Sequence, residues 1–119
     1  MHAILTPIAL IILALRTIPA EAQRSRPAGD VRQVVQQVAT AEAAYRATHG
    51  RYTASLRELG IERTRSVDVR IVAEGARGFS VVAVGPDEEC AVFHGTARPP
   101  RTYARTAARV ACRSRRRSR

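Results

Sequence analysis

Apolar and polar positions recur with a helical period between Asp30 and Tyr52. Apolar residues return there every three or four positions, and the positions between them are mainly Arg, Gln and Glu. This spacing gathers the apolar side chains on one face and predicts one long amphipathic helix of about 19 residues, roughly 28 Å long. The apolar face comprises Val31, Val34, Val35, Val38, Ala41 and Tyr45. The opposite face comprises Arg32, Gln33, Gln36, Gln37, Glu42 and Arg46.

Both ends of this predicted helix carry residues that favour a boundary. The carboxylate of Asp30 can accept hydrogen bonds from the free amides of the first turn, so it is a good N-cap. Gly50 suits the left-handed conformation in which many helices end. An isolated helix of this length is marginal in water. We therefore expect the rest of the chain to cover its valine-rich face.

A short polar segment follows the helix and predicts a second, smaller helical element. Ser55 and Glu58 have the spacing of a capping box. We expect one or two helical turns over residues 54–59, with Tyr52 and Leu56 folded back onto the first helix.

The second half of the chain changes from a helical period to strand-like runs. Apolar residues alternate over the first run, and the second is apolar on both faces, which is typical of a central strand. A five-residue connection with two glycines, 74–78, suits a hairpin, and the Pro-rich segment 96–108 reads as a loop. The predicted strands are 67–73, 79–84, 90–94 and a short last strand at 109–112. We predict an α+β fold, with the N-terminal helix packed on a three- to four-stranded antiparallel β-meander.

The first 22 residues differ from the rest. A 13-residue apolar run, Ala3–Leu15, precedes Pro19 and the tripeptide Ala-Glu-Ala at 20–22. These features predict a cleaved secretory signal peptide, because the run is shorter than the ~20 residues that span a bilayer. An uncleaved membrane anchor is the alternative. We expect an exported protein, secreted or periplasmic, with a flexible leader at 23–29 and a single domain at 30–112.

Charge is strongly positive and is carried by arginine alone. The chain has 20 arginines, no lysine and ten acidic residues, a net charge of +10. Five of the arginines lie in the last seven residues, 113–119, which predict a disordered tail. The predicted polyanion-binding residues are Arg113, Arg115, Arg116, Arg117 and Arg119. Such a tail attracts nucleic acid or an anionic surface. The use of arginine in place of lysine throughout the chain can also reflect the base composition of the genome.

The two cysteines, Cys90 and Cys112, allow three interpretations. An even number in an exported chain indicates one disulfide. A thiol nucleophile paired with His94 is disfavoured, because the three acidic residues at 87–89 raise the pKa of the Cys90 thiol. A zinc site lacks paired ligand spacing even when His49 is included. Residues 87–89 suggest a solvated turn, or alternatively a calcium cluster.

Catalytic motifs are missing from the sequence. We find no Ser/His/Asp set, no phosphate-binding glycine loop and no carboxylate pair. We therefore predict a non-enzymatic protein with no cofactor, no metal and no evident small-molecule substrate.

The order of features resembles a known family. The relevant motifs are the helix end YRATHGRYT (45–53), the turn SLREL (55–59), the strand segments VRI (69–71), GFSVVA (78–83) and CAVFHG (90–95), and the final VAC (110–112). Over residues 30–112 the chain resembles the soluble head of type IV pilins and type II secretion pseudopilins. The resemblance implies a helix on an antiparallel sheet, a disulfide-closed surface loop, and partners among pilin-like or envelope proteins. The chain lacks the prepilin leader and the long apolar helix, so it looks like a pilin head behind an ordinary export signal.

These observations lead to three functional hypotheses. The first is an exported pilin-like domain for protein or cell-surface interaction. The second is a secreted polyanion-binding module that uses the arginine tail. The third is a small secreted hydrolase or inhibitor.

Overall fold

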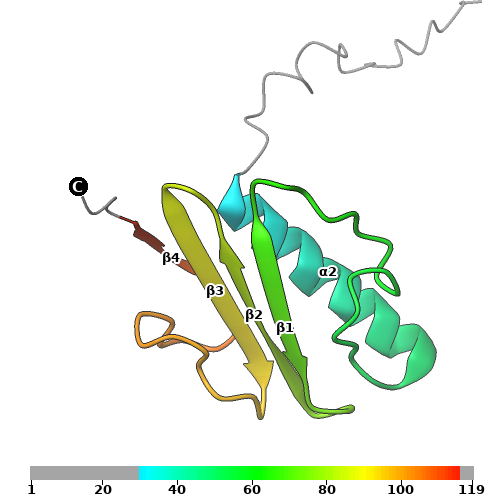
Figure 1. The fold of residues 1–119 in the computed structure, drawn as a ribbon. Coiled ribbons are helices and arrows are strands. Elements are labelled where there is room, and N and C mark those ends of the chain that lie inside the picture. Colours follow the sequence, from blue (N-terminus) through cyan, green and yellow to red (C-terminus); the bar gives the residue numbers. More distant parts are fainter. Residues whose placement is uncertain (1–29, 116–119) are drawn as a thin grey trace, which may run out of the picture.

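The computed structural model describes residues 30–115 as an α+β fold with one helix and a four-stranded antiparallel sheet. The strands follow the order β1-β2-β3-β4, so each pairs with its neighbour in sequence (Figure 1). The elements are α2 (Val31–His49), β1 (Asp68–Ala73), β2 (Gly78–Val84), β3 (Glu88–Gly95) and β4 (Ala111–Ser114). The α+β class and the meander are confirmed. The predicted signal peptide, leader and last four tail residues lie outside the described residues.

The boundaries of α2 follow from the capping residues that the sequence offers. Asp30 is extended, and its carboxylate accepts a hydrogen bond from the Gln33 amide at 3.3 Å. Gly50 is left-handed, with φ of 73°, and its amide donates to the Arg46 carbonyl at 2.8 Å. A side chain would be strained at that φ. Both predicted ends of the helix are confirmed.

The main core lies between α2 and the sheet. Side chains alternate along each strand, so every second residue of β1, β2 and β3 points toward the helix. Figure 1 shows α2 running across one face of the sheet. The most deeply buried members of this core are Val31, Val35 and Val38 from α2, Phe79 and Val81 from β2, and Cys90 and Val92 from β3. The predicted packing of the valine face on the sheet is confirmed.

The opposite, outer face of the sheet is covered only in part. The loop at 96–110 lies over β2 and β3, where its Ala97 and Ala104 pack on Val82, Ala91 and Phe93. Tyr103 of the same loop packs against this cluster, and the Ala108 amide donates to the Phe93 carbonyl at 2.8 Å. β1 remains outside the cover, and Val72 at its outer face is 59% exposed.

The segment after α2 forms one hydrogen-bonded turn, which does not extend into a helix. The Ser55 hydroxyl accepts from the Glu58 amide at 3.2 Å, as a capping residue does. The Ser55 carbonyl then accepts from Leu59 at 3.2 Å, but Gly60 is left-handed with φ of 71° and ends the turn there. The prediction was one or two helical turns over 54–59: the capping contact and one such turn form, but no second turn follows.

Glu42 was assigned to the polar face of the helix, and this assignment was wrong. Its side chain is fully buried, and one carboxylate oxygen accepts from the Thr53 amide at 2.9 Å. The chain turns back after Gly50 and covers this part of α2. Burial raises the pKa of Glu42, and the hydrogen bond from Thr53 opposes that shift only in part. The second carboxylate oxygen has no hydrogen-bond partner among the described residues.

The domain extends beyond its predicted end at residue 112. β4 continues through Ser114, and the Arg115 amide donates to the Asp87 carbonyl at 2.9 Å. The prediction of a disordered tail was therefore wrong for residues 113–115, which pair with β3 and the turn before it. No helix within residues 30–115 is long and apolar enough to cross a membrane.

Candidate functional site

A disulfide joins Cys90 of β3 to Cys112 of β4. The two residues are direct cross-strand partners, with Cα atoms 4.0 Å apart, and Cys90 is fully buried. The bond therefore closes a loop that carries residues 96–110 across the outer face of the sheet. The expected disulfide is present, and it occupies the thiol that a Cys90 nucleophile would need. Glu88 lies beside both sulfurs, but bonded sulfurs are not thiolate ligands, so this group does not form a metal site.

Glu89 fixes the closed loop to the sheet. It was expected in a solvated turn, but it lies near the start of β3 and is only 5% exposed. Its Oε2 accepts a hydrogen bond from the Tyr103 hydroxyl at 2.8 Å. The same oxygen forms ion pairs with Arg101 at 3.4 Å and Arg113 at 3.1 Å. One carboxylate thus connects the loop, through Tyr103 and Arg101, to β4, through Arg113.

The charge state of this cluster follows from its contacts. Burial raises the pKa of Glu89, but the hydrogen bond from Tyr103 and the charges of Arg101 and Arg113 together lower it by more, so the pKa lies below its ordinary value. Burial and the bond to Glu89 raise the pKa of Tyr103, so the phenol remains a donor at neutral pH. The Arg113 guanidinium also lies 5.0 Å from the centre of the Tyr103 ring, within cation–π range.

Glu89→Gln should destabilise the domain at neutral pH and much less in acid. The lowered pKa means that the stabilising effect of the ionised carboxylate is complete above the unfolded pKa of about 4.3 and is lost as the pH falls through the folded value. We expect a loss of roughly 1.5–3 kcal/mol at pH 7, the usual range for hydrogen bonds to a charged group. Urea unfolding of the wild type and the variant between pH 7 and pH 3 measures this difference in the free energy of unfolding.

Glu62→Gln is the matched control, because Glu62 is exposed in the loop before β1. Its stability should follow the wild type across the same pH range. A Glu89 variant with a constant deficit from pH 7 to pH 3 would show that lost packing, and not lost charge, explains the effect.

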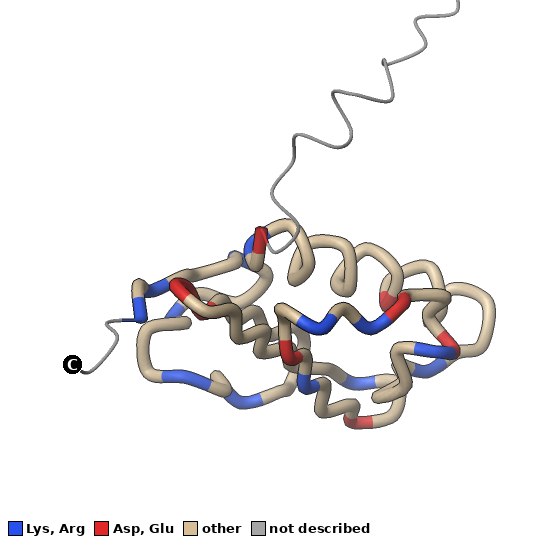
Figure 2. The backbone as a smooth tube through the Cα atoms, turned by 45° about the horizontal axis from the view of Figure 1, so that its top comes forward, with Lys and Arg blue, Asp and Glu red and all other residues tan. Residues whose placement is uncertain are grey.

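Arginine is the main charged residue of the closed loop and β4. Residues 96–115 contain six arginines and no acidic residue. Figure 2 shows several blue arginine segments near the C-terminal end of the described chain, and others spread over the rest of the molecule. Within residues 30–115, the side chains of Arg98, Arg105 and Arg109 form no hydrogen bond or ion pair. This surface, which we call the arginine loop, comprises Arg98, Arg101, Arg105, Arg109, Arg113 and Arg115.

The five arginines predicted to bind polyanions fall into two groups, those inside and those outside the described residues. Arg113 pairs with Glu89, and an Arg115 side-chain nitrogen donates to the Gly85 carbonyl at 2.9 Å. Arg116, Arg117 and Arg119 lie outside the described residues. Sequence reasoning missed the four arginines at 98, 101, 105 and 109. The acid-free stretch from residue 96 to residue 115 is the signal that could have found them.

A groove lies between the arginine loop and β1 on the outer face of the sheet. Its volume is about 370 Å³. Its floor is formed by Val72, Val82, Ala97 and one polar residue, Ser80, and one wall by Pro99 and Pro100. Its rim is formed by Arg70, Arg98, Arg101 and Glu74. We call this feature the outer groove.

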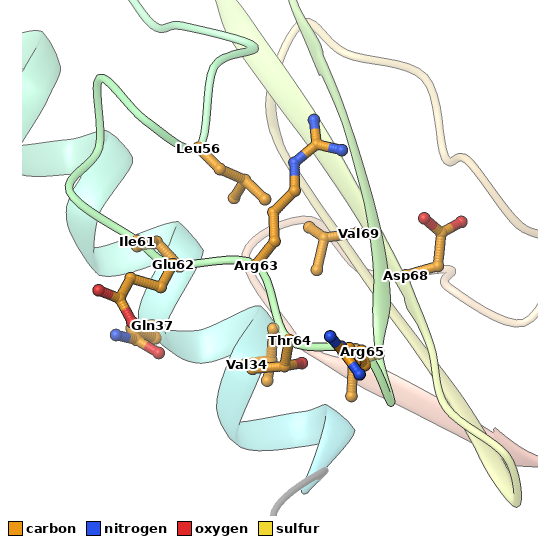
Figure 3. A pocket seen from close by; sticks show the side chains of 11 residues that line it. Val34, Gln37, Leu56, Ile61, Glu62, Arg63, Thr64, Arg65, Asp68 and Val69 are labelled. Atoms are coloured by element: carbon orange, nitrogen blue, oxygen red, sulfur yellow. The ribbon is translucent and has the colours of Figure 1, made fainter.

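A second hollow of about 220 Å³ lies on the helix side, between α2, the 56–67 loop and β1. In Figure 3, Leu56 and Val69 border it, the stem of Arg63 passes between them, and the Asp68 carboxylate lies on the other side of β1. Arg63, Arg65 and Glu62 also line it, whereas the Asp68 carboxylate points away from it.

The histidines form no catalytic arrangement within the described chain. The His94 ring stacks on Phe79 at 4.7 Å, and burial lowers its pKa. A His49 ring nitrogen lies 3.2 Å from the Tyr45 carbonyl, and its ring stacks on Tyr45 at 4.0 Å. Among residues 30–115, neither ring is hydrogen-bonded to a serine or a carboxylate.

Comparison of the chain with protein-family models, with curated proteins and with solved structures finds no match. The resemblance to pilin heads therefore stays a prediction. The feature with the most distinctive chemistry in residues 30–115 is the disulfide-closed arginine loop.

Proposed function

We propose that this chain is an exported, non-enzymatic interaction domain of the pilin-head type, and that the arginine loop is its contact surface. The observation that carries the proposal is the construction of that loop. A disulfide and the Glu89 cluster fix a segment of six arginines onto a rigid sheet. A fixed surface loses little conformational entropy when it binds, which favours recognition of a specific partner.

The pilin-like part of the proposal is supported by the order of elements. One helix precedes an antiparallel meander, and a disulfide joins the last two strands. The resemblance implies this same order, with a long N-terminal amphipathic helix and the disulfide-closed loop at the surface. Other pilin-like proteins or envelope proteins are the partners that follow from it.

Binding to polyanions is the second candidate function. It is favoured by the three loop arginines that have no partner within residues 30–115, together with the arginines of the C-terminal tail. The two candidates differ in their dependence on net charge. A polyanion binder loses affinity steeply with salt, with a slope of about −0.9 per phosphate contact on duplex DNA.

Deleting residues 116–119 should leave binding to a protein partner within about twofold of the full-length value. The deletion removes three arginines but keeps Arg113 and Arg115, which belong to the fold. The partner is first captured with tagged, exported protein and identified. Its affinity for both forms is then measured in a salt titration, beside duplex DNA and anionic vesicles.

The deletion also separates the two candidates. Loss of all partner binding on deletion would overturn the interaction-domain proposal. Strong DNA or vesicle binding that the deletion abolishes would favour the polyanion module in its place.

A further inference from the structure

The outer groove combines an exposed apolar surface with a basic rim. Val72, in the groove floor, is the one large hydrophobic residue that is strongly exposed within residues 30–115. Val82 and Ala97 extend the floor under the edge of the arginine loop. Val82 and Ala97 are themselves buried, so Val72 supplies the exposed apolar contact and the rim supplies the charge.

The wall of the groove is preorganised. Pro99 and Pro100 have fixed φ angles, so this wall loses little freedom when a ligand is bound. Ala97 is buried against the sheet, and the Arg101 side chain donates to the Pro100 carbonyl at 2.9 Å while it pairs with Glu89. The position of the wall is therefore fixed on both sides.

The charge of the rim selects an anionic ligand. Three arginines and one acidic residue, Glu74, line the rim. Arg101 is already paired with Glu89, and the Glu74 carboxylate accepts from the Thr96 hydroxyl at 3.4 Å, so Arg98 and Arg70 carry the positive charge that a ligand meets. Arg98 has no side-chain partner within residues 30–115. Arg70 pairs with Asp68 at 3.5 Å, but both side chains are more than two-thirds exposed, so this pair is weak and can exchange for a ligand carboxylate.

The apolar lining decides between the anionic polymers. No aromatic ring from residues 30–115 lines the groove, so the described part of the chain lacks the platform on which unpaired nucleic-acid bases stack. Valine, alanine and proline instead match an aliphatic side chain. We infer that the outer groove binds a short acidic peptide segment of a partner protein, with one aliphatic side chain placed on Val72 and the flanking carboxylates on Arg70 and Arg98. This inference rests on the proposed function, because it names the partner chemistry of the same loop.

The test uses a fluorescein-labelled pentapeptide with a central leucine flanked on each side by two glutamates. Its anisotropy is measured with the exported protein. Val72→Asp should raise the dissociation constant at least tenfold, because it removes the apolar floor and repels the peptide. Arg98→Glu should raise it at least fivefold. Replacing the central leucine by serine should weaken binding to the wild type at least fivefold.

Arg57→Glu is the matched control for Arg98→Glu. It makes the same change of charge on an exposed residue in the turn after α2, away from the groove. Its affinity for the peptide should stay within twofold of the wild type. Arg98 is an exposed loop residue, so Arg98→Glu keeps the test valid even if Val72→Asp fails to fold, which circular dichroism checks.

Four results would overturn the inference, and the fourth would leave the proposed function intact. The first is wild-type affinity in both groove variants. The second is an equal loss in Arg57→Glu and Arg98→Glu, which would indicate general electrostatic attraction. The third is full displacement of the peptide by a decathymidylate oligonucleotide at lower concentration than by unlabelled peptide. Retention of the captured partner by both groove variants would refute the groove site and leave the proposed function intact.

Discussion

Val38→Asp is expected to abolish the stable folded state of the domain at neutral pH. Val38 is fully buried between α2 and the sheet. The change loses about 1.5–3 kcal/mol of apolar burial and places a carboxylate among the buried apolar side chains of the main core, at a cost of several kcal/mol more. A domain of this size has a total stability of roughly 5–10 kcal/mol. Far-UV circular dichroism and urea unfolding measure the outcome.

Gln37→Asp is the control at the neighbouring position. Gln37 is exposed on the same helix, and the two substitutions introduce the same side chain at similar helical positions. The cost in helix propensity is about 0.5 kcal/mol, so the control should remain folded. Equal destabilisation by the two substitutions would contradict the packing of the valine face on the sheet.

The sequence was informative where one physical effect dominated. The helix ends were predictable because Asp30 and Gly50 each satisfy a local requirement of the backbone. The valines of α2 were predictable because a periodic pattern has only one face to bury. The strands followed from β-branched runs and glycine connections.

The errors arose where segments distant in the sequence determine the surroundings of a side chain. Glu42 lies four residues after Val38 and seven after Val35, so spacing alone would have placed it on the valine face. Its charge argued for the opposite face. The sequence does not reveal that the Thr53 amide returns to meet it, because that contact depends on the path of the chain after Gly50.

The candidate site was predictable only in its covalent part. The cysteine count and the predicted export signal favoured the disulfide. The Glu89 cluster was not predictable, since it joins residues from β3, the closed loop and β4 that meet only after the sheet has formed. Arg113 was therefore assigned to a solvated tail, although its nearest charged partner lies 24 positions earlier in the chain.

Removal of the disulfide should cost about 3 kcal/mol of stability, the value for closing a loop of this length. The bond joins residues 22 positions apart and connects β4, a strand of only four residues, to β3. Without it, β4 is retained by four residue pairs and by the contacts of Arg113 and Arg115. Amide hydrogen exchange in β4 should therefore become faster than in β2, which is paired on both sides.

Two forms of the protein separate the cross-link from the packing of its sulfur atoms. Reduced wild type keeps both sulfurs and loses only the bond, whereas Cys90→Ala with Cys112→Ala also removes the atoms that fill a buried site. We expect the reduced protein to lose most of the 3 kcal/mol in urea unfolding, and the double variant to lose somewhat more, because truncation leaves a small cavity. Equal unfolding midpoints for oxidised and reduced wild type would show that the Glu89 cluster retains β4 by itself. Two alkylatable thiols in protein taken directly from its native compartment would contradict both the bond and the predicted export, because a reducing compartment keeps such a pair open.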